Sequence, residues 1–215
     1  MDVDEYNPAA PNVKTGDPPA RISCNRHLCY NPPVREMEKQ MAPITKRIIV
    51  LAMHGAPPSD FPVAERAELF RLKAQISHAV AASTGDVQAR YAALETKMRT
   101  WPRTAANDPF YAASHTLAAA LRQTSGGSVV VGFNEFCAPS IDEALDLAQA
   151  AGADEVIAVT PMMTPGGAHA EHEIPAAVAA AQVRHPGVVF RYAWPFNVAD
   201  VAGFLFAQID RAVSG

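Results

Sequence analysis

Two histidines, two glycines and two glutamates lie within the short stretch TPMMTPGGAHAEHEIP, residues 160–175. Imidazole binds divalent transition metals, and its pKa near neutrality lets it accept or release protons under ordinary conditions. Two other segments carry related chemistry: LAMHG ends in His54 and Gly55, and GFNEFCAPS contains Glu135. Two imidazoles and a carboxylate can bind a divalent metal or move protons, provided that the fold brings them together.

Four short apolar runs, rich in β-branched residues, predict the strands that would position these side chains. Runs of this kind are typical of strands buried on both faces of a parallel sheet. They are RIIVLAM (47–53), SVVVGFNEF (128–136), EVIAVTPMM (155–163) and VVFRYAWPF (188–196).

Helical patterns alternate with these runs. One covers residues 109–122, where Asp108 can cap the helix and Pro109 suits its first position. A second covers 140–152, with Ser140 and Glu143 at capping-box spacing. The other two run from about residue 175 to 184 and from about 198 to 212. Strand–helix alternation predicts an α/β fold: a four-stranded parallel sheet flanked by helices, in flavodoxin- or Rossmann-like layers.

Residues 56–107 interrupt the alternation and predict an inserted helical hairpin after the first strand. Apolar residues recur at helical spacing before and after the turn STGD (83–86). They are Leu69, Leu72, Ile76 and Val80, then Val87, Tyr91, Leu94, Met98 and Trp101. The segment carries seven basic and five acidic residues, a net charge of +2. The hairpin leaves the sheet beside His54, so it could wall or cover a pocket there, or pack on the sheet or on a second subunit.

The proline-rich residues 1–44 show no sustained hydrophobic period and predict a loosely ordered extension ahead of a single α/β domain over 45–215. The extension contains Cys24, His27 and Cys29. A structural zinc site normally uses four ligands, and no second cysteine pair follows, so ordinary thiols are the favoured interpretation.

Composition excludes several classes of protein. The chain has 215 residues, 49% hydrophobic and 19% charged, which is enough to build a core. The net charge of −4 argues against a nucleic-acid partner, and the absence of a long apolar run argues against a membrane span. Three cysteines suggest no disulfide framework. A cytoplasmic location is the expectation.

The carboxyl ends of the four predicted strands should meet at one edge of the sheet, where ligands of open parallel sheets bind. That edge would receive His54, Glu135, His169 and, from WPFN, Trp194 and Asn197. Each also has a structural interpretation. The alternatives are a hydrogen-bonded loop residue for each histidine, a cap of the next helix for Glu135, and a turn for Gly166 and Gly167. The coincidence at one edge favours a functional site.

The three segments resemble motifs of the class II tetrapyrrole chelatases, the sirohydrochlorin cobalt- and ferrochelatases of the CbiX/SirB type. LAMHG resembles their HG motif, and GFNEFCAPSIDEAL resembles their strand–Glu–Pro-Ser–helix segment. PMMTPGGAHAEHEIP resembles their Gly-x-His segment, in which the histidine precedes the acid of the acid-Ile-Pro triplet by four positions. With Glu173 as that acid, the matching histidine is His169, and His172 has no counterpart.

The resemblance implies insertion of cobalt, iron or nickel into sirohydrochlorin or a related tetrapyrrole, with no cofactor beyond that divalent metal substrate. His54, His169 and Glu135 would be the catalytic and metal-binding residues. A homodimer is also implied. The substrate-binding candidates are Gly55, Ser140, Gly166, Gly167, Trp194 and Asn197.

Departures from the family pattern leave alternatives open. The hairpin lengthens the chain, and Ala56 stands where the usual HGS turn has serine. A non-catalytic metal or tetrapyrrole carrier on the same scaffold is the main alternative. A histidine-dependent hydrolase is disfavoured, because no arginine adjoins His54 and no GxxxxGK[ST] motif is present.

Overall fold

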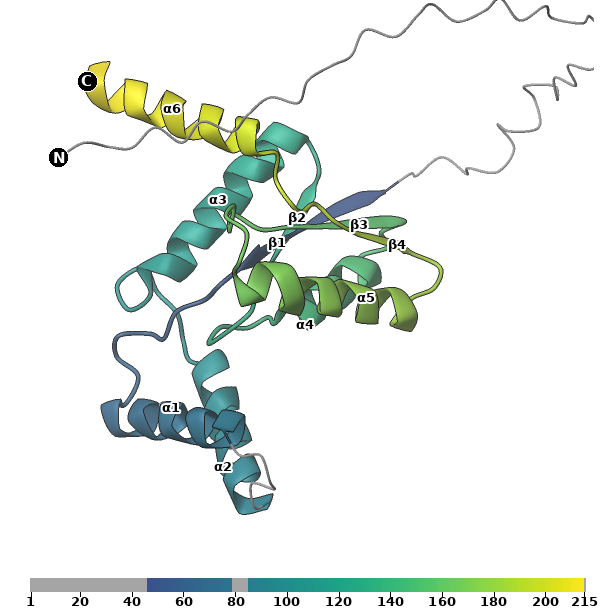
Figure 1. The fold of residues 1–215 in the computed structure, drawn as a ribbon. Coiled ribbons are helices and arrows are strands. Elements are labelled where there is room, and N and C mark those ends of the chain that lie inside the picture. Colours follow the sequence, from purple (N-terminus) through teal and green to yellow (C-terminus); the bar gives the residue numbers. More distant parts are fainter. Residues whose placement is uncertain (1–45, 79–84, 215) are drawn as a thin grey trace, which may run out of the picture. The chain divides into compact units, whose positions relative to one another are not determined.

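The computed structural model describes residues 46–78 and 85–214 (Figure 1). The predicted extension over 1–44, including Cys24, His27 and Cys29, lies outside the described residues, as do the first two residues of the predicted STGD turn.

Four parallel strands form one sheet in the order β2-β1-β3-β4. They are β1 (Arg47–Met53), β2 (Ser128–Phe133), β3 (Glu155–Val159) and β4 (Val189–Tyr192). This topology confirms the predicted α/β fold. The last three strands are shorter than predicted, because the polar or proline-containing ends of those runs leave the sheet as loops.

Helices cover both faces of the sheet, as Figure 1 shows. Alternate residues of β1 face opposite layers, as the pleat of a strand requires. Ile48, Val50 and Ala52 pack in the core beneath α4 (Ile141–Ala150) and α5 (Ile174–Arg184). Leu51 and Met53 pack on the other side with α3 (Pro109–Ser125).

The predicted starts of α3 and α4 are confirmed. The Asp108 side chain accepts a hydrogen bond from the backbone N–H of Tyr111 at the start of α3. Ser140 and Glu143 form the capping box of α4. Glu135 therefore does not cap that helix, which removes one structural interpretation of this carboxylate.

The insertion contains two helices, α1 (Val63–His78) and α2 (Gly85–Arg99), with a small apolar core of their own. Phe61, Leu69, Leu72, Leu94 and Met98 are almost fully buried there. A side chain from the sheet's edge, Phe136, packs against this core. The hairpin is thus attached to the loop that follows β2.

Two helical features follow β3 and β4. A π-helix, η1 (His169–Glu173), runs directly into α5, so the chain becomes helical earlier than predicted. The prediction placed the start near Pro175 because proline suits a first turn, and a π-turn has no clear sequence signal. The last helix, α6 (Val198–Ser214), has no buried residue. Among the helices of the described residues, none is long and apolar enough to cross a bilayer.

Candidate metal centre

Strand pairing places Glu135 directly beside His54. Met53 of β1 is in register with Phe133 of β2, and the backbone N–H of Asn134, just after β2, donates to the Met53 carbonyl at 2.9 Å. The backbone N–H of Glu135 donates to the His54 carbonyl at 2.9 Å. Two residues separated by 81 positions in the sequence therefore share one edge, as the parallel topology predicted.

Gly55 allows the two loops to approach this closely. Its φ is +97°, and a β-carbon there would lie 1.9 Å from the Glu135 carbonyl oxygen. Any other residue would combine an unfavourable backbone conformation with a clash against backbone atoms. The glycine of the HG motif is thus explained by the spacing between the two loops.

His169 enters the same cluster from η1. The Tyr192 hydroxyl of β4 donates to the Ala170 carbonyl at 3.0 Å, which fixes this turn to the sheet. The rings of His54 and His169 meet edge to face, with centroids 4.7 Å apart. One ligand atom each from His54, Glu135 and His169 lies within 4.8 Å of the others.

Hydrogen bonds determine which nitrogen of each histidine is available. His54 Nδ1 lies 2.8 Å from the Gly55 carbonyl, which can only accept, so Nδ1 carries the proton. His169 Nδ1 lies 2.7 Å from a carboxylate oxygen of Glu173 and likewise donates. In the neutral form of each ring the lone pair is then on Nε2, and the Nε2 atom of His54 is 3.8 Å from Glu135 Oε2. A carboxylate or carbonyl behind the ring is the usual support of a metal-binding histidine.

Lys73 of α1 completes the charge balance of the cluster. Its ammonium group forms an ion pair with Glu135 Oε1. Burial alone would raise the pKa of the Glu135 carboxyl, but the Lys73 partner, with His54 and His169 nearby, outweighs it and lowers the pKa. Glu135 is therefore an anion at neutral pH, available to a cation.

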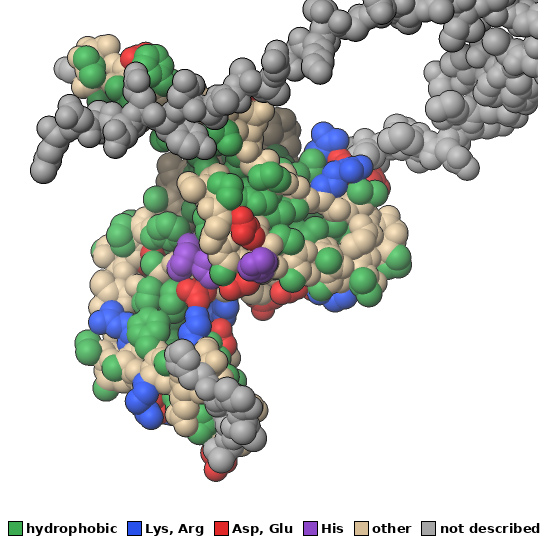
Figure 2. Space-filling model, viewed as in Figure 1, with side chains coloured by type: hydrophobic (Ala, Val, Ile, Leu, Met, Phe, Trp, Pro, Cys, Tyr) green, Lys and Arg blue, Asp and Glu red, His purple; other side chains and the backbone are tan. Residues whose placement is uncertain are grey.

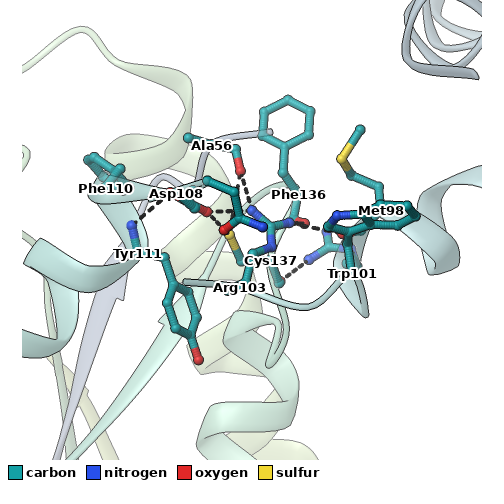
Figure 3. A network of polar contacts seen from close by, with 12 residues as sticks. Ala56, Met98, Trp101, Arg103, Asp108, Phe110, Tyr111, Phe136 and Cys137 are labelled. Atoms are coloured by element: carbon teal, nitrogen blue, oxygen red, sulfur yellow. Dashed lines mark hydrogen bonds and ion pairs between the residues drawn. The ribbon is translucent and has the colours of Figure 1, made fainter. Parts of the chain in front are cut away.

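Two arginines of the insertion hold the loop that carries Glu135. Arg99 donates to the carbonyls of Asn134 and Cys137, each at 3.0 Å. Arg103 donates to the carbonyls of Ala56 and Phe136, which follow the two site loops, and pairs with buried Asp108 (Figure 3).

Phe136 has a positive φ of 62°, unusual for a bulky residue. This strained position is held between the hairpin core and Arg103. Backbone strain of this kind is kept only where the surroundings fix it.

The hairpin also walls a pocket beside Glu135. Its lining combines Lys73, Tyr91 and Arg99 from the hairpin with Glu135 and Glu173 from the sheet's edge. Histidine side chains gather on this face, next to acidic and basic side chains that lead toward the hairpin (Figure 2). Of the predicted roles of the insertion, this lining agrees with a wall of a pocket next to the site loops; packing on a second subunit stays a prediction.

The remaining predicted residues are not part of the three-residue cluster. Ser140 lines a second, smaller pocket with Arg99 and Asn134. Gly166 and Gly167 lie in the exposed loop before η1, with open space around both. Trp194 stacks on Tyr192, and Asn197 caps α6 through Ala199. His172 is exposed and outside the three-residue cluster, and Cys137 is fully buried, as predicted for a small filler.

Sequence reasoning did not single out Lys73, Arg99, Arg103 or the support that Glu173 gives to His169. The net positive charge of the insertion was the only available signal, and it does not tell which cation reaches the site. Five of the seven insertion cations pair with carboxylates, and the one that pairs with Glu135 is Lys73; the others are Arg90, Lys97, Arg99 and Arg103.

The fold and the cluster define an α/β domain with a potential metal centre at the carboxyl edge of its sheet. Residues 106–209 match the family model of CbiX. This confirms, for that part of the chain, the predicted resemblance to the CbiX/SirB class II chelatases. Glu135 and His169 lie within the matched residues, and His54 precedes them.

A curated relative is similar to a shorter part of the chain. The sirohydrochlorin cobaltochelatase of Priestia megaterium is 36% identical over 70 residues, which are 33% of this chain and 22% of the relative. The match thus spans under a quarter of that protein's length.

Two solved structures are also similar. The sirohydrochlorin chelatase SirB from Bacillus subtilis subspecies spizizenii, in complex with cobalt, is 17% identical with a TM-score of 0.35, over 70% of this chain and 43% of that one. A cobalamin (vitamin B12) biosynthesis CbiX protein from Marinobacter aquaeolei VT8 is 17% identical with a TM-score of 0.37. The match covers 77% of this chain and 95% of that one. With TM-scores this low, the fold assignment depends on the sheet topology itself.

Proposed function

We propose that this protein is a sirohydrochlorin chelatase, which inserts a divalent metal ion into sirohydrochlorin or a closely related tetrapyrrole. The observation that carries the proposal is the cluster of His54, Glu135 and His169 at the sheet's carboxyl edge. Cobalt is the first metal to test, because the curated relative is a cobaltochelatase. Iron and nickel suit the same nitrogen and oxygen donors.

The donor set fits the chemistry of insertion. A divalent ion joins the ring as two pyrrole N–H protons leave, so the reaction needs a temporary metal site and proton acceptors. Two neutral imidazoles and one carboxylate bind such ions without the permanence of a four-ligand structural site. His54 and His169 are the proposed metal-delivering and proton-accepting groups, and Glu135 offsets the metal's charge.

The macrocycle would be held by groups that surround the cluster. Its acidic side chains would meet backbone donors at the start of α4, where Ser140 is the cap. Gly55, Gly166 and Gly167 would let the ring approach the backbone, and Trp194 and Asn197 would border it at the end of β4. These substrate contacts are inferred from position at the same edge of the sheet.

Turnover separates an enzyme from a carrier. Sirohydrochlorin would be mixed anaerobically with Co²⁺, Fe²⁺ or Ni²⁺ and a small fraction of an equivalent of protein, and the absorbance of the ring followed. Product that exceeds the protein many times over supports the chelatase. Spectral change limited to the amount of protein added identifies a carrier instead.

We also propose that the active form is a homodimer. α6 exposes Leu205 and Ile209, four residues apart on one helical face, at 54% and 58% of their surface. A second copy of the chain would cover such a face. Sedimentation of wild type and of Leu205→Glu/Ile209→Glu tests this, with a dimer expected for wild type and a monomer for the variant. A wild-type monomer would rule the proposal out.

A cytoplasmic location stays a prediction.

A further inference from the structure

The ion pair between Lys73 and Glu135 connects the inserted hairpin to the proposed metal site. Lys73 belongs to α1, and Glu135 follows β2, 62 positions later. The ammonium also lies 5.9 Å from the centre of the Phe136 ring. Lys73 is therefore the hairpin residue in direct contact with a proposed metal ligand.

A divalent ion at the cluster and the Lys73 ammonium would compete for one carboxylate. Lys73 pairs with Oε1 of Glu135, and His54 Nε2 approaches Oε2. An ion bound by this carboxylate and two imidazoles would lie within a few ångströms of the ammonium. Like charges at that separation repel strongly in a partly buried site, and the single charge of Glu135 cannot balance the three positive charges that would then contact it.

Lys73 has room to leave. Its side chain is 44% exposed, so the ammonium can swing into solvent while its stem stays on the hairpin. Tyr91, Glu95 and Glu173 line the adjacent pocket, and the two glutamates offer alternative acidic partners. The movement needs only a change of side-chain rotamer and no opening of the hairpin core.

We propose that Lys73 is an exchangeable cation at the metal site, which the incoming divalent metal displaces from Glu135. The inference rests on the proposed function, since it takes His54, Glu135 and His169 as the metal ligands. Lys73 would keep Glu135 oriented for binding while weakening the site's hold on the ion. A chelatase needs such a moderate affinity, because the ion must pass on to the ring. Lys73 is thus a positioning residue.

Co²⁺ alone is the probe that tests this exchange. Its dissociation constant would be measured by anaerobic calorimetry for wild type, Lys73→Met and Lys73→Arg. Lys73→Met keeps the length of the side chain and removes its charge, so we expect Co²⁺ to bind about tenfold more tightly or better. Lys73→Arg keeps the charge and can pair with the Glu135 carboxylate through two N–H groups, so it should bind Co²⁺ no more tightly than wild type.

Lys97→Met is the matched control. Lys97 is also a half-exposed lysine of the hairpin, but it pairs with Glu65 at 2.7 Å, away from the cluster. Lys97→Met changes the net charge by the same amount as Lys73→Met. If Lys97→Met leaves the Co²⁺ affinity unchanged, the tighter binding of Lys73→Met is due to the lost contact with Glu135. Equal tightening in both variants would overturn the exchange, because general charge would then explain it.

His54→Ala separates failure of this inference from failure of the proposed function. If His54→Ala loses Co²⁺ binding while Lys73→Met binds no more tightly than wild type, the metal site stands and the exchange is wrong. If His54→Ala binds Co²⁺ like wild type, the proposed metal site itself is wrong, and the exchange is overturned with it.

Discussion

Arg103 offers the sharpest test of how the insertion supports the site. Its side chain is only 6% exposed, and it pairs with Asp108, which is 1% exposed. It also donates to the carbonyls of Ala56, Met98 and Phe136 (Figure 3). Removing one partner of a buried ion pair leaves the other charge without compensation, which costs about 3–5 kcal/mol.

Arg103→Met keeps an apolar stem and removes every one of these donors. We expect the free energy of unfolding to fall by about 3–5 kcal/mol, and the midpoint of thermal unfolding to fall by about 10 °C. The site should suffer as well, because the two carbonyls beside His54 and Glu135 lose their common donor. Co²⁺ affinity should therefore decrease under conditions in which the variant is still folded.

Urea unfolding followed by circular dichroism measures the effect, with Arg90→Met as the control. Arg90 pairs with Glu68 at 2.8 Å, but its side chain is 52% exposed, and exposed pairs contribute only about 0–1 kcal/mol. A loss below about 1 kcal/mol for Arg103→Met, equal to that of the control, would refute the reasoning that this network is a buried support of the site.

Two further predictions concern a backbone position and a buried carboxylate. Gly55→Ala should destabilise the protein by about 1–3 kcal/mol through its backbone conformation alone, and it should weaken Co²⁺ binding. Gly167→Ala is the control, because Gly167 has open space around it and no positive φ, so neither stability nor binding should change. Equal behaviour of the two variants in thermal melting and calorimetry would contradict this prediction. The arginines Arg191 and Arg47 lower the pKa of Glu155, so its stabilisation is present above its unfolded pKa and lost as the pH falls through the folded value. Glu155→Gln should therefore unfold more readily than wild type at pH 7, with a gap that closes below about pH 4; a gap independent of pH would contradict the assignment.

Local sequence signals were sufficient to predict the sheet, the helix caps and the residues of the cluster. β1 spans the whole predicted run: Arg47 begins it at the exposed end of the sheet, and the apolar residues that follow are mostly buried between the two helical layers. Ser140 and Glu143 are three positions apart, and the side chain of each accepts a hydrogen bond from the backbone N–H of the other. The start of α4 can therefore be predicted from the local sequence. The meeting of His54 with Glu135 followed from parallel pairing, which brings strand ends together whatever lies between them.

Contacts between distant segments could not be predicted in the same way. Which of seven insertion cations reaches Glu135 depends on how α1 packs against α2 and Phe136, and several lysines and arginines fit the helical pattern equally well. Arg103 donates hydrogen bonds to the carbonyls of Ala56 and Phe136, which are 47 and 33 positions away from it in the sequence. Because every residue has a backbone carbonyl, the sequence does not indicate which carbonyls an arginine will reach. The π-turn that carries His169 depends on a tyrosine of β4.

The roles of the histidines are tested most directly by turnover of matched alanine variants. Co²⁺ insertion into sirohydrochlorin would be followed with catalytic amounts of wild type, His54→Ala, His169→Ala and His172→Ala. His172 is the control, because it is an exposed histidine of the same π-helix as His169 but lies outside the cluster. The account predicts that turnover is lost in the first two variants and kept in His172→Ala. Turnover that survives both His54→Ala and His169→Ala would contradict it.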